Sequence, residues 1–567
     1  MHKNTVVKPV FIILLLSVLF TVIIQLDLTR AIFFDNYLNT RQISGVNYYL
    51  SLINESSKGN WQLGSPYILE WRYAPYLYPA LNINAPGLFK RVLGLDIKLY
   101  AAIMGYLSVF SIMALMLMAF SYIFSSNYFG YLLATVFIFF PRVIMWNRTL
   151  SPEINFIPLA LFLIFYFSNF KFWKREIGLA LSTGILFYIY PYYWTFALVL
   201  LGISDFWKFW DEKKIIWNYL YKYLLTMGLA SWYLAHLWQI QHLSYYRETM
   251  ARIGFLYSRL PAGWYTQAVL LSSLIIYFFL KKYIFPRLDI KMIADGALNK
   301  IVAGLVASLV VLNQQLITNV QMEFNSHYFP VILVFLVAFW GSLTFILISN
   351  FNFYKKSILI FLSFLLVTGL VAVRIYQISA SFGPDGYIGG KADGVVEWLL
   401  KNQIQDKVVY APEDLGDEIN LWTNNYLVWN DNQALQLTPT NELIDRFTYF
   451  DITNQNITNH LFDRQTAIFG QTFISSMQKD NVINNIKAKL SGKNFVPATL
   501  AEYTKYDFEP MYKKRIQPDS AEFNKYLEKF HVSYLVYRQK DRNSIYKSVP
   551  GKIVFESESY LIKKLAP

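Results

Sequence analysis

An acidic residue with aromatic neighbours follows the first apolar stretch of this 567-residue chain. Asp35 lies in the string FFDNY (33–37). Aromatic rings lower the local dielectric and raise the pKa of a nearby carboxyl, toward the range in which a carboxylate accepts a proton from a reacting hydroxyl. The alternative interpretation is an acid that caps the helix after it. We take Asp35 as the candidate general base.

Two charged residues lie among Trp and Tyr side chains in the same polar segment, 27–98. Glu70 and Arg72 stand in EWRYAPYLYP (70–79), shortly after GNWQLGSPY (59–67). Flat aromatic faces suit stacking on sugar C–H groups, and Glu and Arg offer directional hydrogen bonds. The alternative is that these rings form the aromatic belt of a membrane protein. We predict that Glu70 and Arg72 bind a polar substrate.

Arginines recur in two further polar segments. The guanidinium fork matches phosphate oxygens, so a lipid phosphate is the expected ligand. The alternative for the second segment is an ion pair along a helix between Glu248 and Arg252, at i and i+4. The candidate residues are Arg142, Arg148 and Glu153 in PRVIMWNRTLSPE (141–153), and Arg247 and Arg252 further along.

A run rich in amides joins two apolar segments near the middle of the chain. It reads NQQLITNVQMEFNSHYF (313–329) and includes Gln314, Gln315 and His327. Polar groups at the end of an apolar helix are costly unless they meet partners or water. Helix capping and interhelical hydrogen bonds are the alternative. The number of amides favours a polar cavity that binds substrate.

The sequence has no motif for a metal site or for thiol chemistry. The chain has no Cys, and its six His show neither HExxH nor a paired ligand spacing. No glycine-rich phosphate loop is present. We therefore predict no cofactor, and a divalent metal has no motif to support it.

The elements that must position these residues are membrane helices. Hydrophobic residues make up 55% of the chain and aromatic residues 18%. Apolar runs long enough to cross a bilayer recur up to about residue 376, and the expected helices are nearly free of charged residues. No small-residue cleavage site follows the first run, which favours an uncleaved signal anchor. The expected helices are 9–26, 99–124, 128–140, 154–169, 177–190, 192–206, 217–238, 265–285, 300–316, 328–349 and 357–376.

The stretch 177–203 is broken at Tyr190-Pro191, because proline disfavours helix in the residue before it. Two helices there give eleven in total and place the Lys-rich loops, together with the N-terminus, on the cytoplasmic side of the plasma (inner) membrane. The segments 27–98, 141–153, 239–263 and 313–327 then share the outer face with the C-terminal region. That face has eight acids before residue 378: Asp27, Asp35, Glu55, Glu70, Asp96, Glu153, Glu248 and Glu323.

The net charge of +14 is the sum of +15 before residue 378 and −1 from residue 378 onward. Membrane topology explains it, so we predict no nucleic-acid partner. After residue 378 helical and strand patterns alternate: helices at 395–400 and 523–530, and strands at 407–411, 532–537 and 560–562. We predict an α-helical polytopic membrane protein, 1–377, with an extracytoplasmic mixed α/β domain, 378–567.

The pattern resembles the GT-C superfamily of polytopic glycosyltransferases. The resemblance rests on the loop with Asp35, GNWQLGSPYILEW (59–71), RTLSPE (148–153), YPYYW (190–194) and NQQLITNVQMEFNSHYF (313–329). It implies an inverting transferase that takes a sugar from a polyprenyl-phosphate donor at the outer leaflet. Asp35 would be its base, and its phosphate partners would be drawn from Arg142, Arg148, Arg247, Arg252 and His327. One departure is Ser44-Gly45-Val46, where members often carry an acid.

Three other classes stay open. A transporter or flippase tends to place ions near the bilayer midplane and to show internal repeats. A polysaccharide polymerase or ligase would share the lipid-linked substrates, and a scaffold would only present the C-terminal domain. The expected partners are membrane lipids, the lipid-linked donor and an acceptor that is a glycan, a lipid or a protein.

Overall fold

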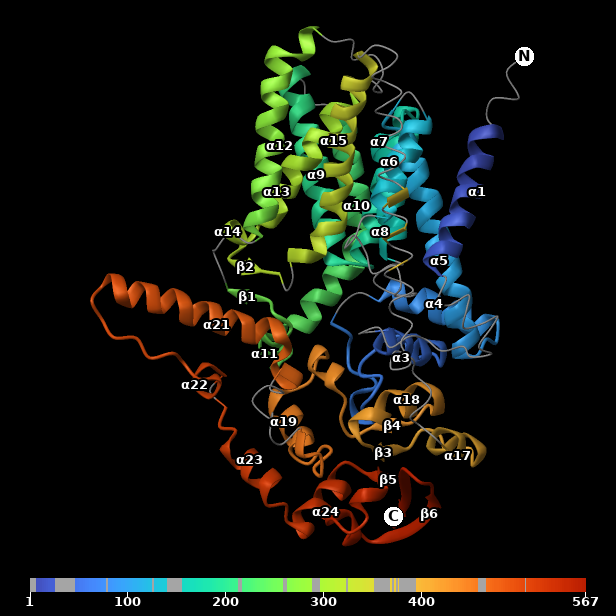
Figure 1. The fold of residues 1–567 in the computed structure, drawn as a ribbon, viewed down its shortest axis with the longest axis vertical. Helices are drawn as coiled ribbons and strands as arrows, with labels where there is room; N and C mark the ends of the chain where they lie inside the picture. Colours follow the sequence, from blue (N-terminus) through green and yellow to red (C-terminus); the bar gives the residue numbers. More distant parts are fainter. Residues whose placement is uncertain are drawn as a thin grey trace.

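A bundle of long helices stands on a C-terminal region that contains a β-sheet (Figure 1). The computed structural model describes residues 7–25, 46–77, 80–124, 127–139, 155–212, 217–257, 263–287, 296–322, 325–350, 368–369, 372–373, 376, 394–456, 466–504 and 506–566.

Ten of the eleven expected apolar segments are helices of the bundle. Their ends agree with the expected ones within a few residues, because long hydrocarbon runs are the strongest signal in such a sequence. Most of the eleventh segment, 357–376, lies outside the described residues, so the count of eleven stays a prediction. The ten are α1 (Val7–Ile24), α5 (Ile97–Ser121), α6 (Asn127–Phe139), α7 (Phe156–Phe167), α8 (Phe172–Phe187), α9 (Pro191–Glu212), α10 (Trp217–Gln241), α12 (Trp264–Tyr283), α13 (Ala297–Leu312) and α15 (Phe329–Asn350).

The predicted break in the stretch 177–203 is confirmed. α8 ends at Phe187, and α9 begins at Pro191. Proline is favoured at a first helical position, where its missing N–H would have no partner in the helix. Tyr190 is therefore held outside both helices.

Among the described residues, four helices are long and apolar enough to cross a membrane: Leu99–Ser121, Trp264–Tyr283, Ala297–Thr318 and Phe329–Leu347. The apolar helices at Pro9–Ile24, Tyr128–Phe139 and Phe156–Phe167 are shorter. The chain is a multi-pass membrane protein.

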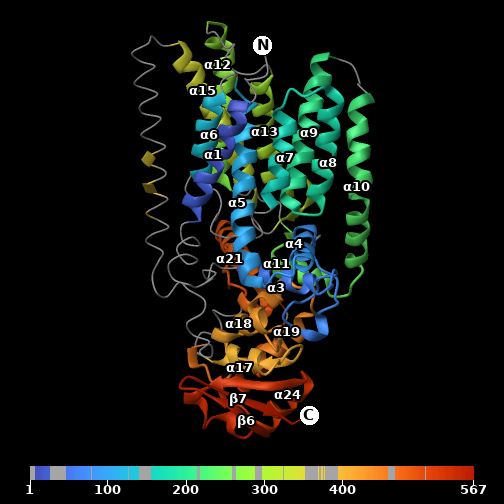
Figure 2. The same cartoon turned by 90° about the vertical axis from the view of Figure 1, so that its right-hand side faces the viewer.

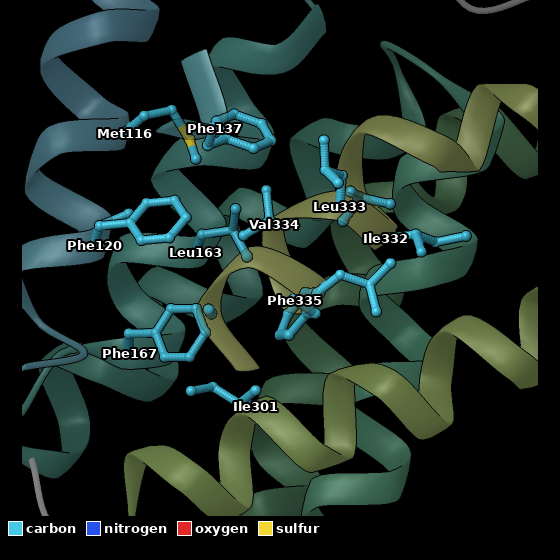
Figure 3. Packing of buried hydrophobic residues seen from close by; sticks show 14 of the residues in the cluster. Met116, Phe120, Phe137, Leu163, Phe167, Ile301, Ile332, Leu333, Val334 and Phe335 are labelled. Atoms are coloured by element: carbon cyan, nitrogen blue, oxygen red, sulfur yellow. The ribbon is translucent and has the colours of Figure 1, made fainter. Parts of the chain in front are cut away.

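The core of the bundle is built from aromatic and branched side chains of α5, α7, α13 and α15 (Figure 3). Phe120, Leu163 and Phe335 are fully buried in it. α13 and α15 approach closely at Gly304, where any side chain would collide with the Phe335 ring. Small residues allow such close helix packing in membranes.

Most of the short elements between the long helices lie at the end of the bundle nearest the C-terminal region, which we call the domain-side end (Figures 1 and 2). The described start of α1 lies at the opposite end. Two short strands that are far apart in sequence pair antiparallel there, with Leu256 opposite Gln321. The elements are α3 (Val46–Ser57), η1 (Leu69–Trp71), α4 (Leu81–Val92), α11 (Tyr246–Ile253), β1 (Leu256–Tyr257), α14 (Gln315–Thr318), β2 (Val320–Gln321) and η4 (Asn325–Tyr328).

The C-terminal region has a mixed five-stranded sheet with the order β4-β3-β5-β7-β6. β3 is parallel to β4 and β5, and β7 is antiparallel to β5 and β6. All five elements predicted from the sequence are present, as α17, β3, α24, β5 and β7. The region comprises α17 (Val395–Lys401), β3 (Val408–Tyr410), α18 (Glu413–Thr423), β4 (Tyr426–Leu427), η6 (Asp431–Leu435), α19 (Thr440–Thr448), α21 (Thr466–Leu490), α22 (Leu500–Thr504), α23 (Glu509–Ile516), α24 (Ser520–Lys529), β5 (Val532–Arg538), β6 (Gly551–Glu556) and β7 (Tyr560–Leu565).

The segment 46–77 shares a core with this region. Ile53 and Tyr67 are buried in one apolar cluster with Leu399, Leu415 and Ile562. The domain boundary at residue 378 stays a prediction. The first long loop, although it precedes that boundary in sequence, packs against the C-terminal region.

Candidate functional site

The side chains of His327 and Tyr190 meet at the domain-side end of the bundle. The imidazole Nδ1 of His327 shares a hydrogen bond with the Tyr190 hydroxyl. The two rings are stacked, with centroids 5.7 Å apart, and Tyr192 packs edge-on to the imidazole at 4.8 Å. Because α9 begins at Pro191, Tyr190 lies just outside the helix, and its side chain reaches His327 in η4. The break in the helix thus positions a phenol against an imidazole.

The turn that carries His327 is fixed by its neighbour Tyr328. The Tyr328 side chain is buried, and its hydroxyl lies 2.9 Å from the Thr195 hydroxyl and 3.4 Å from the Met322 sulfur. A satisfied buried hydroxyl restricts the backbone beside it. The imidazole is therefore held by a rigid turn.

Two other loops reach the same end. The amide of Leu81, the first residue of α4, donates to the Tyr188 carbonyl at 3.1 Å. The Asn82 amide donates to the Asn155 side chain at 2.9 Å. Asn155 directly precedes Phe156, whose ring packs edge-on to Tyr193 at 6.0 Å. The first long loop, the start of α7 and the α8–α9 break therefore adjoin the His327 turn.

Four candidate residues lie outside the described residues: Asp35, Arg142, Arg148 and Glu153. The stretches that carry them, 26–45 and 140–154, join the described chain at Val46 and Asn155. Their roles stay predictions.

Gln314 and Gln315 hold the turn that precedes His327. The Gln314 amide donates to the Val320 carbonyl at 3.0 Å, and the buried Gln315 amide donates to the Leu312 carbonyl at 3.1 Å. These bonds match the capping alternative. Both side chains lie at the domain-side end, and their role in binding substrate stays a prediction.

Glu70 and Arg72 join the first loop to other charged groups. Arg72 Nε lies 2.9 Å from Glu55 Oε2, and Glu55 also accepts from Lys58 at 2.7 Å. Glu70 Oε2 lies 3.1 Å from Arg446 Nη2 in α19, so this carboxylate ties the loop to the C-terminal region. Their contacts are those of an interface, and a role in binding substrate stays a proposal.

Arg252 is buried and also bonds to the C-terminal region. Its guanidinium donates to the Thr440 hydroxyl and to the carbonyls of Gln436 at 3.2 Å and Thr438 at 2.6 Å. Burial lowers the pKa of Arg252 to about 10, which leaves it a cation at neutral pH. Glu248 on the same helix accepts from the Thr440 amide at 3.3 Å. Arg247 is exposed and stays a candidate phosphate partner.

The contacts of Tyr190, Asn82 and Asn155 were not predicted from the sequence. For Tyr190 a signal was present, since YPYYW marked the helix break that releases it. For the two asparagines no pattern linked residues 73 positions apart. Tertiary contacts of this kind leave no periodic trace in a sequence.

Contrary to the expectation of helices nearly free of charged residues, a buried ion cluster joins α8, α9 and α10 away from the domain-side end. Lys222 Nζ lies 3.0 Å from Glu176 Oε2 and 2.7 Å from Asp205 Oδ2, and Arg175 pairs with Glu176 at 2.7 Å. Arg175 and Glu176 precede the expected helix 177–190, whereas Asp205 and Lys222 lie inside the expected helices 192–206 and 217–238. The observed helices include all four residues, because the ions pair with one another.

Within the described part of the chain, no three His, Asp or Glu side chains are grouped so that they could hold a metal ion.

No family model and no curated protein matches the sequence. Solved structures do. ArnT from Cupriavidus metallidurans bound to undecaprenyl phosphate is 12% identical, with a TM-score of 0.43, over 100% of both chains. An oligosaccharyltransferase from Archaeoglobus fulgidus, tethered with an acceptor peptide containing the NVT sequon, is 11% identical with a TM-score of 0.47, over 98% of this chain and 74% of that one. Both TM-scores are below 0.5, so these likenesses assign the chain neither a family nor an activity.

Proposed function

We propose that the chain is a membrane glycosyltransferase that moves a sugar from a polyprenyl-phosphate donor to an acceptor at the outer face of the membrane. The observation that carries the proposal is the Tyr190–His327 pair at the domain-side end, beside the contacts of Leu81 and Asn82 with the chain around it. A lipid-linked substrate would present its phosphate at this depth, where the helices give way to polar loops.

The proposed step is a displacement at the anomeric carbon. The acceptor oxygen forms a bond to that carbon while the bond from carbon to phosphate oxygen breaks, and the configuration inverts. The acceptor proton passes to Asp35, and the electron pair leaves with the lipid phosphate. Cationic donors are most effective where negative charge develops in a site with little water.

His327 fits the role of a phosphate partner. Tyr190 orients the imidazole, and an imidazole whose Nδ1 is engaged can direct Nε2 to a ligand. Arg142, Arg148 and Arg247 are the candidate guanidinium partners, with Glu153 beside Arg148 in sequence. Gln314 and Gln315 position the turn that carries His327.

The remaining candidates act at a distance in this proposal. Glu70, Arg72 and Arg252 hold the first loop, α11 and the C-terminal region together. They would thereby shape the acceptor side of the site. The acceptor itself would be a glycan, a lipid or a protein.

The central experiment replaces the base. Asp35→Asn keeps the side-chain size and removes the proton acceptor, so transfer from a polyprenyl-phosphate sugar should fall by at least ~100-fold. Asp96→Asn is the matched control in the same loop. Asp96 accepts a hydrogen bond from the Leu99 backbone N–H at 2.9 Å, and the side-chain oxygen of Asn can accept the same bond. The release of lipid phosphate and the labelled product are both measured on the purified protein in nanodiscs.

Full turnover of the Asp35→Asn protein would remove Asp35 as the base. A wild-type protein that moves the donor across the bilayer without releasing lipid phosphate would contradict the transferase and favour the flippase.

A further inference from the structure

The outer half of α21 has an apolar stripe that no described part of the protein covers. Val482, Ile486 and Leu490 are 59%, 54% and 84% exposed. They stand at i, i+4 and i+8, so they share one side of the helix. Lys487 and Lys489 project on either side of this stripe, and Lys493 follows just beyond the helix.

The inner half of α21 is anchored to the protein. Ile468, Phe469 and Phe473 are buried in one cluster with Phe508 and Met511, and Ala251 of α11 packs against it. α21 then projects sideways from the C-terminal region, next to the domain-side end of the bundle (Figure 1). Its position is therefore set by the protein, while its outer half extends beyond it.

The return segment after α21 shows which way the stripe faces. The Asn481 side chain exchanges two hydrogen bonds with the backbone of Ala498, each 3.0 Å, and Tyr503 donates to Asp480 at 2.9 Å. Tyr503 also packs on Phe473, which is about two and a half turns from Val482 and so on the opposite side of the helix. The return segment runs on the side away from the bundle (Figure 1), so the stripe faces the membrane side.

The bundle exposes its own apolar residues near that level. Trp264 and Tyr265 at the start of α12 are 65% and 70% exposed, as expected of aromatic anchors at a membrane interface. Ile317 in α14 is exposed as well.

We propose that the outer half of α21 lies on an anionic lipid surface, with Val482, Ile486 and Leu490 in the headgroup boundary. The apolar stripe supplies buried area, and the lysines beside it extend to lipid phosphates. Charge complementarity therefore favours lipid over a second protein as the occupant. This contact would hold the C-terminal region at a fixed height over the membrane, and it is independent of the proposed chemistry.

The absence of Cys in the chain allows single-site labelling of the full-length protein. Ile486→Cys and Asn484→Cys place a fluorophore on opposite sides of the same turn, both at exposed positions. In nanodiscs with phosphatidylglycerol and headgroup-level nitroxide lipid, quenching at 486 should exceed that at 484 by about threefold or more. Replacing phosphatidylglycerol with phosphatidylcholine, or introducing Lys487→Glu with Lys489→Glu and Lys493→Glu, should reduce the difference.

Equal quenching at the two positions, low or high, would overturn the proposal. Weak quenching at 486 together with disulfide-linked dimers of the Ile486→Cys protein would overturn it too, and would identify a second copy of the chain as the occupant. If quenching at 486 exceeds quenching at 484 equally in neutral and anionic lipid, the lysines do not contribute to the contact, and the proposed preference for anionic lipid is overturned.

Discussion

The hydroxyl of Tyr190 is a single group whose removal tests the proposed site. Tyr190→Phe keeps the ring that stacks on His327 and deletes the hydrogen bond to Nδ1. The imidazole then loses its orienting partner, so kcat for sugar transfer should fall about 10-fold while the protein remains folded. His327→Gln should lower the rate further, because it removes the proposed phosphate partner itself.

Tyr328→Phe is the matched control at the next residue. It also deletes a buried hydroxyl, which contacts Thr195 and Met322, and should cost about 1 kcal/mol of stability. Its effect on kcat should be smaller than that of Tyr190→Phe, since the imidazole keeps its hydrogen-bond partner and only the turn behind it loses a contact. Equal loss of rate in the Tyr190 and Tyr328 variants would mean that Tyr190 only supports the fold.

At this scale the sequence indicated residue types better than partners. His327 and the amides before it were recognised because polar residues between apolar runs are conspicuous. The contacts of Arg252 with residues 436–440 could not be foreseen, since they join segments 184 or more positions apart. The N–H donors of arginine can bond to phosphate oxygens and to backbone carbonyls alike, so residue type alone did not separate the two roles.

Among the elements, α8, α9 and α10 depend on the buried cluster around Lys222. The side chains of Lys222 and Glu176 are 2% and 1% exposed. Lys222→Met leaves two carboxylates buried with too little positive charge, which should destabilise the protein by ~3–5 kcal/mol. The unfolding temperature in detergent, followed by tryptophan fluorescence, should therefore fall by several degrees.

A compensating variant separates charge from packing. Adding Glu176→Gln and Asp205→Asn to Lys222→Met removes both carboxylates and leaves Arg175 as the one charge of the four. This triple variant should recover part of the lost stability. An unchanged unfolding temperature in the single variant would contradict a buried, paired Lys222.

The elements themselves were predicted unevenly, for a physical reason. Long apolar runs predicted the long helices, and short runs of branched and aromatic residues predicted β5 and β7, whose side chains are mostly buried. α3 and α4 lie in a segment expected to be a polar loop, and their stability comes from packing against the C-terminal region rather than from helix propensity. β1 and β2 have two residues each and pair across 60 or more positions, so no local sequence pattern predicts them.

For the whole molecule, the arrangement of bundle and C-terminal region depends on contacts such as Arg252. Arg252→Met leaves the carbonyls of Gln436 and Thr438 without this charged donor. We expect a loss of at least ~2 kcal/mol in the local opening free energy, or about 30-fold faster hydrogen exchange in η6 and α19. If docking shapes the acceptor side of the site, sugar transfer should fall in the same variant although Asp35 is intact.

Arg247→Met provides the comparison on the same helix, because Arg247 is exposed. Its exchange in η6 and α19 should match the wild type, and any loss of transfer should then come from weaker donor binding, seen as a raised KM for the lipid-linked sugar. Fast exchange in the Arg252 variant with normal transfer would show that the chemistry does not need the docked C-terminal region. Unchanged exchange would show that α11 does not hold that region, and the bundle and the first loop would then have to position it alone.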